Sequence, residues 1–120
     1  MRGKKILGAA LAAVFTVSVA SPASAVTIGT AGLFLPVLTT CNLLPPLFQE
    51  TARVPAEAFD EHGCGAEIEV EAAGGQKVTA KVTDRCGVCA RGDIDLSPAA
   101  FDRIGRRDEG RVKVTWNFID

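Results

Sequence analysis

Tyrosine is absent from this sequence, and tryptophan, methionine and histidine each occur once among its 120 residues. The lack of tyrosine argues against a sugar-binding groove that draws its affinity from stacking on many aromatic rings. The single histidine, His62, lies in a polar turn, where we expect a surface residue. A cysteine–histidine protease is also excluded if, as argued below, every cysteine forms a disulfide.

A hydrophobic run long enough to cross a membrane is also missing. The longest apolar run, Ile6–Ala20, has about 15 residues, whereas a membrane span needs roughly 20. It follows the basic start Met1–Lys5 and precedes Ser21–Ala25, which is rich in small residues. This order is typical of a secretory signal peptide. We therefore expect residues 1–25 to be a cleaved signal peptide and residues 26–120 to be one secreted domain that does not associate with a membrane.

An excess of basic charge is the third absence. Three of the 13 Lys and Arg residues lie in the expected signal peptide and none of the 14 Asp and Glu residues do, so the mature charge is 10 minus 14, or −4. Nucleic-acid binding requires a basic face, so we do not expect a nucleic-acid partner. The mature length of 95 residues (120 minus 25) is sufficient for one modest hydrophobic core.

All four cysteines, Cys41, Cys64, Cys86 and Cys89, lie in the expected secreted domain. An even number of cysteines in a small secreted domain predicts two disulfides. Cys86 and Cys89 have the spacing of a zinc knuckle, but Cys41 and Cys64 are too far apart to form the second short-spaced pair. The glycines and charges around Cys86 favour a loop over the helix start of a redox centre. We expect no metal and no other cofactor.

Two stretches alternate between apolar and charged residues, Ala66–Glu71 and Lys77–Thr83, with a glycine-containing turn between them. Alternation of this kind predicts a β-hairpin with one buried face and one face of opposed glutamates and lysines. The register of this hairpin makes a Cys64–Cys86 bridge with Cys41–Cys89 geometrically natural. Cys41–Cys64 with Cys86–Cys89 is the alternative, and the sequence does not choose between them.

The remaining pattern predicts a small, mostly β barrel with one or two short helices. A strand is expected at 27–35, a helical turn within 53–60, and a closing strand at 112–119. Ser97 has the character of a helix N-cap because Pro98 follows it at the first helical position, and Gly105 is expected to end that helix.

The stretch VTDRCGVCARGDIDLSPAAFDRIG, followed by GRVKVTWNFI, resembles the RlpA-like double-psi β-barrel superfamily. This superfamily includes the barrel of bacterial expansins and the papain inhibitor of streptomycetes. The resemblance covers residues 53–120 and implies that residues 26–120 form a six-stranded double-psi β-barrel domain. The first strand departs from the family, which typically has Gly-x-Ala-Thr-Tyr where this chain has Gly29-Thr30-Ala31-Gly32-Leu33.

The resemblance also implies roles for individual residues. Asp84 matches the family's aspartate that contacts glycan and serves as a candidate catalytic acid, with Arg85 and Asp93 as neighbouring ligand contacts. His62 is a weaker catalytic candidate, because RlpA-like enzymes use a histidine before the central hairpin. The resemblance implies structural roles for Asp95, which we expect to bind backbone amides near the helix start, and for Ser97.

Three functions follow from the resemblance. The first is a monomeric, non-hydrolytic barrel that binds cell-wall polysaccharide, although the absence of tyrosine argues against this function. The second is an inhibitor of a secreted papain-type cysteine protease, for which the apolar segment 33–48 is one candidate contact loop. The third is a peptidoglycan lytic transglycosylase with Asp84 as its acid, so catalysis is not the leading expectation.

Overall fold

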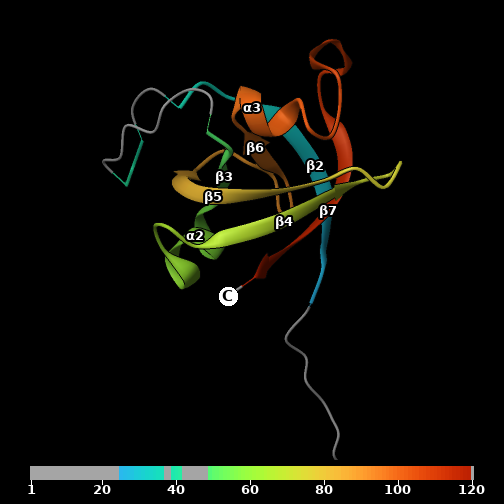
Figure 1. The fold of residues 1–120 in the computed structure, drawn as a ribbon. Helices are drawn as coiled ribbons and strands as arrows, with labels where there is room; N and C mark the ends of the chain where they lie inside the picture. The colour runs from blue at the N-terminus through green and yellow to red at the C-terminus, as the bar shows by residue number, and fades with distance from the viewer. Residues whose placement is uncertain (1–24, 37–38, 42–48, 120) are drawn as a thin grey trace, which may run out of the picture.

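The computed structural model describes residues 25–36, 39–41 and 49–119. Six strands close into a barrel in the order β2-β6-β3-β5-β4-β7. Within these described ranges, two α-helices and one 3-10 helix accompany the strands, and α3 and α2 lie at opposite ends of the barrel (Figure 1). The elements are β2 Thr27–Leu33, β3 Thr51–Pro55, α2 Ala56–His62, β4 Glu67–Ala72, β5 Lys77–Cys86, β6 Ile94–Leu96, α3 Pro98–Phe101, η3 Arg107–Glu109 and β7 Val112–Ile119. The predicted fold class is therefore confirmed, whereas most of the expected signal peptide lies outside the described residues.

The central hairpin is formed by β4 and β5, as the alternation predicts. Glu67 lies opposite Lys81 and Glu71 lies opposite Lys77. The alternate side chains point into the barrel, where the core is continuous. It includes Ile68, Val70, Val78, Ala80 and Val82, each no more than 4% exposed. The hairpin thus places one apolar face inward and one charged face outward because successive strand residues point to opposite sides.

The helix starts follow the local sequence signals. Pro55 precedes α2, and the hydroxyl of Ser97 accepts a hydrogen bond from the backbone N–H of Ala100 at the start of α3. Regular helix ends at Phe101 rather than at Gly105 as expected. After it, the N–H groups of Arg103 and Ile104 donate to carbonyls three residues earlier, and the Gly105 N–H donates to the Phe101 carbonyl four residues earlier.

Parallel pairing places segments that are distant in sequence side by side. β2 pairs with β6 and β3 pairs with β5, both in parallel, while the other four pairings are antiparallel. β6 has only three residues, all buried. So short a strand has no readable alternation, and its place is set by the two strands that flank it.

The two disulfides are Cys41–Cys64 and Cys86–Cys89, with Cα separations of 5.7 and 5.4 Å. The pairing that the hairpin register favoured, Cys64–Cys86 with Cys41–Cys89, is therefore wrong. The N–H of Gly65 donates to the Val82 carbonyl, so Cys64 lies short of Cys86 along β5. The N–H of Cys41 donates to the Thr83 carbonyl, which brings Cys41 to the same stretch of β5.

Among the described residues, no helix is both long enough and apolar enough to span a bilayer.

Candidate functional site

A row of residues crosses four neighbouring strands at one level of the barrel. The parallel register of β2 and β6 pairs Gly32 with Asp95, and the antiparallel register of β6 and β3 pairs Asp95 with Arg53. An irregularity after Ala52 in the β3–β5 ladder then pairs Arg53 with Asp84. The site residue Asp84 is thus separated from Asp95 by one arginine on the strand between them.

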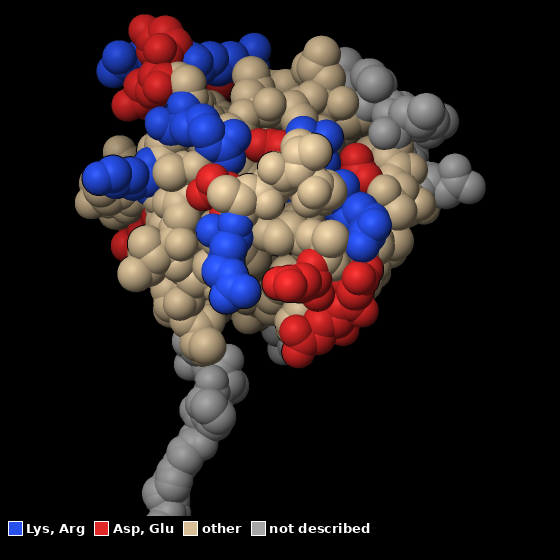
Figure 2. Space-filling model, turned by 180° about the vertical axis from the view of Figure 1, so that it is seen from behind, with Lys and Arg blue, Asp and Glu red and all other residues tan. Residues whose placement is uncertain are grey.

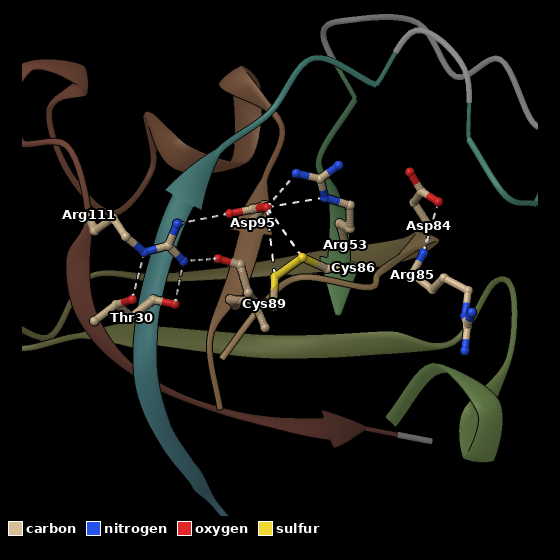
Figure 3. Close-up of polar contacts among 9 residues, drawn as sticks. Thr30, Arg53, Asp84, Arg85, Cys86, Cys89, Asp95 and Arg111 are labelled. Atoms are coloured by element: carbon tan, nitrogen blue, oxygen red, sulfur yellow. Dashed lines mark hydrogen bonds and ion pairs between the residues drawn. A yellow bond between two sulfur atoms is a disulfide. The ribbon is translucent and has the colours of Figure 1, made fainter. Parts of the chain in front are cut away.

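Asp95 is the centre of this row and binds two guanidinium groups (Figure 3). Its Oδ2 accepts hydrogen bonds from Nη2 of Arg53 at 2.6 Å and from Nε of Arg53 at 3.1 Å. Its Oδ1 accepts one from Nη1 of Arg111 at 3.1 Å. The Asp95 side chain is only 8% exposed, so these charge-assisted bonds satisfy a buried carboxylate. The sequence predicted backbone amides as its partners, and the structure gives it arginines instead.

Gly32 makes room for Arg111. A Cβ at position 32 would lie 2.2 Å from Nη1 of Arg111 and 2.9 Å from Oδ1 of Asp95. This is the position at which the family's first strand typically carries threonine. Arg111 also donates to the Thr30 hydroxyl at 2.8 Å and to the Ile94 carbonyl at 2.8 Å. The glycine therefore permits an arginine of the loop before β7 to reach across β2 and bind Asp95.

The Cys86–Cys89 disulfide packs against the same carboxylate. Its two sulfur atoms lie 4.0 and 3.9 Å from Oδ2 of Asp95. Disulfide sulfur has no hydrogen to donate, so these are packing contacts. The three side chains together have the spacing of a possible metal site. A closed disulfide supplies no thiolate ligand, however, so the cluster cannot bind a metal in this form.

Asp84 lies nearer the surface and receives its own set of donors. Its Oδ1 accepts hydrogen bonds from the backbone N–H groups of Thr40 and Arg85, both at 2.9 Å, and from the hydroxyl of Thr40. The Arg85 side chain turns away to form an ion pair with Asp60 of α2 at 3.2 Å. Asp84 therefore fastens the 39–41 segment to the end of β5.

The other two predicted site residues lie in different surroundings. The His62 ring stacks on Phe118 of β7, with centroids 3.6 Å apart and planes 8° from parallel. Oδ1 of Asp93 accepts a hydrogen bond from the Thr30 N–H at 2.8 Å, which ties the loop before β6 to β2. The structure thus brings Asp84 close to Arg53 and Asp95, but it does not place His62 or Asp93 in the same row.

Arg53 and Arg111 were missed by the sequence reasoning. Arg111 lies in the stretch GRVKVTWNFI, but nothing in that stretch or around Arg53 gives either arginine a role, and each reaches Asp95 only because the barrel closes. The one available signal is Gly32, where the family's usual side chain is missing.

This arrangement is better suited to stability than to acid catalysis. A general acid must carry a proton and present it to the substrate. A proton on Asp95 would face guanidinium donors on both of its oxygens rather than an acceptor. Among the described residues, the exposed large apolar side chains are all aliphatic: Val26, Ile28, Leu33, Leu35, Val88 and Ile119.

Comparison with known proteins places this barrel in a family. The family model described as lytic transglycolase matches residues 46–116, more than half of the chain. An expansin of Bacillus subtilis is 42% identical over 55 residues, and a papain inhibitor of Streptomyces mobaraensis is 39% identical over 56. Each alignment covers 46% of this chain, but only 23% of the expansin and 38% of the inhibitor.

Solved structures extend the comparison to the whole barrel. A Streptomyces papain inhibitor superposes with a TM-score of 0.70 at 26% identity, over 80% of this chain and 96% of that one. A mutant Clavibacter michiganensis expansin in complex with cellohexaose gives 0.69 at 23% identity, over 80% of this chain and 51% of that one. The fold, the matched segment and these relatives agree: the chain belongs to the double-psi β-barrel family whose model is described as lytic transglycolase.

Proposed function

We propose that this protein is a secreted, monomeric inhibitor of papain-type cysteine proteases that acts by binding and not by catalysis. The observation that carries the proposal is the extent of the likeness to the Streptomyces papain inhibitor. That likeness takes in 96% of the inhibitor chain, whereas the expansin structure is matched over only 51% of its length. A single barrel is therefore a sufficient unit for inhibition in a relative of this chain.

We call Asp84, Arg53 and Asp95, together with Arg111 that binds Asp95, the polar row. The polar row supports a binding function over a lytic one. Asp84, the candidate acid, and its neighbour Asp95 both accept hydrogen bonds from the protein's own donors. An inhibitor needs a rigid scaffold and no catalytic proton, so the same contacts that weaken acid catalysis suit an inhibitor.

Binding of cell-wall polysaccharide is the second candidate, and the row of polar side chains favours it. Arg53 and Arg111 are 32% and 46% exposed, so their guanidinium groups and Asp84 together could donate and accept hydrogen bonds with sugar hydroxyls. We rank it second because no exposed large apolar side chain among the described residues is aromatic. On the face shown in Figure 2, basic and acidic side chains lie next to one another, so neither sign of charge dominates it.

One experiment separates these candidates. The full chain is expressed in a secreting bacterial host, and the protein is purified from the culture medium. Papain inhibition is measured by titration against a small chromogenic substrate, and the same sample is pulled down on cellulose, chitin and peptidoglycan. We expect stoichiometric inhibition and no retention on the polysaccharides. Retention that Asp84→Asn abolishes, without papain inhibition, would replace the proposal with the polysaccharide-binding function.

A further inference from the structure

We infer that the loop closed by the Cys86–Cys89 disulfide, with Val88 at its tip, is the element that enters the substrate cleft of the target protease. The inference rests on the proposed function and names the contact surface that the comparisons leave open. Three features of the described residues carry it: the exposure of the tip, the fixation of the base, and the free space beside the loop.

The tip of the loop is an apolar side chain with almost no contact to the rest of the barrel. Val88 is 94% exposed, the highest value among the exposed large apolar residues described. A Cβ added to the neighbouring Gly87 would meet nothing within 4 Å, so open space also surrounds the backbone there. A side chain this exposed can enter an apolar pocket of a partner without first breaking contacts within its own chain.

The first end of the loop is fixed in the barrel. Cys86 is the last residue of β5 and is 4% exposed, and its disulfide joins it to Cys89 only three residues later. Both sulfurs pack on the Asp95 carboxylate that Arg53 and Arg111 bind.

The segment that follows Cys89 is fixed as well, so the second end of the loop leads directly into an ordered turn. The Trp116 indole N–H donates to the Gly92 carbonyl at 2.8 Å, and the Thr30 N–H donates to Oδ1 of Asp93 at 2.8 Å. The Asp93 N–H closes the turn through the Ala90 carbonyl at 2.9 Å. A loop held at both ends loses little conformational entropy when it binds, and this preorganisation is what rigid protease inhibitors depend on.

A hollow beside the loop completes the surface. It has a volume of about 280 Å³ and is lined by Pro55, Ala56, Glu57, Arg91 and the disulfide loop itself. The exposed Arg91 contributes a charge-assisted donor of the kind that is enriched at interface hot spots. The partner that fits is therefore an enzyme cleft with an apolar subsite for Val88 and a rim that enters this hollow.

The rival contact surface is the apolar stretch around Leu33 and Leu35, which are 42% and 64% exposed. It has no disulfide-closed turn among its described residues, and residues 37–38 and 42–48, which follow it, lie outside the described ranges. Leu35 therefore serves as a matched comparison for Val88, because both are exposed aliphatic residues.

The test compares the inhibition constants of Val88→Asp, Val88→Leu and Leu35→Asp against papain, using protein purified from the culture medium. We expect Val88→Asp to raise the inhibition constant by about tenfold or more, because a charge would enter an apolar subsite. Val88→Leu and Leu35→Asp are expected to stay within about threefold of the parent. Melting temperatures and non-reducing masses confirm that each variant is folded and disulfide-bonded.

The outcomes distinguish the two levels of the argument. If the parent protein does not inhibit papain, the proposed function falls, and this inference falls with it. If the parent inhibits and folded Val88→Asp inhibits equally well, the function stands and the contact loop is wrong. Loss of inhibition in Leu35→Asp alone would assign the contact to the rival surface.

Discussion

Replacing Asp95 with alanine is expected to destabilise this barrel more than any other change to a charged side chain of the polar row. Asp95 lies between two arginines on different segments and is 8% exposed. Its removal leaves the Arg53 and Arg111 guanidinium groups without their carboxylate and leaves a space beside the Cys86–Cys89 disulfide. The loss is electrostatic and also steric, because the disulfide packs on the carboxylate.

The magnitude follows from the burial of the partners. Removing one member of a fully buried ion pair costs about 3–5 kcal/mol. Arg53 and Arg111 are 32% and 46% exposed and can be rehydrated in part, so we discount this to about 2–3 kcal/mol in the free energy of unfolding. For a domain of this size, about 1 kcal/mol corresponds to a shift in melting temperature of roughly 4–8 °C, so Asp95→Ala should melt about 10–20 °C lower.

The assay is thermal unfolding at neutral pH, followed by circular dichroism, with Asp84→Ala as the matched control. Asp84 is partly exposed and loses hydrogen bonds to Thr40 and Arg85, which should cost about 1 kcal/mol. The reasoning is refuted if the two variants melt at the same temperature, because Asp95 would then contribute no more than a surface carboxylate. A larger loss for Asp84→Ala would refute it equally.

Two further predictions concern the disulfides and the glycines. Replacing both cysteines of Cys41–Cys64 with serine should lower the free energy of unfolding by about 3.5 kcal/mol, and the same change at Cys86–Cys89 by about 2 kcal/mol, because the first disulfide closes the longer loop. Urea denaturation measures both losses. A larger loss for the Cys86–Cys89 variant would contradict this expectation. Gly29→Ala should cost about 2 kcal/mol, because its Cβ would lie 1.9 Å from the Gly92 carbonyl oxygen. Gly87→Ala should change the free energy of unfolding by less than about 0.5 kcal/mol, because a Cβ there meets nothing within 4 Å. If Gly29→Ala and Gly87→Ala lose the same stability in urea denaturation, the contact of position 29 with the Gly92 carbonyl does not matter.

The parts of the fold that the sequence predicted are those whose cause is local. The closing strand at 112–119 matches β7, and the Ser97 cap is present as the pattern indicates. The hairpin of β4 and β5 follows from alternation and from a short turn. In each case residues a few positions apart decide the structure, so the pattern can be read without knowing what packs against it.

The candidate site was predicted only in part. Asp84 is on the polar row, but its neighbour Arg53 comes from a strand more than thirty residues earlier. Arg111 reaches Asp95 from the loop before β7, through the space that Gly32 leaves. Neither contact leaves a trace in sequence spacing, so no spacing rule could have found the two arginines.

The sequence by itself determined the membership of the fold class, the hairpin, the capped helix and the presence of two disulfides. Only the tertiary structure decided which cysteines pair and which arginines bind Asp95. It also decided that Val88 is exposed at the tip of a fixed loop. The physical reason is the parallel pairing of β2 with β6 and of β3 with β5. Parallel neighbours are joined by long connections, so their register depends on closure of the whole barrel rather than on any one segment.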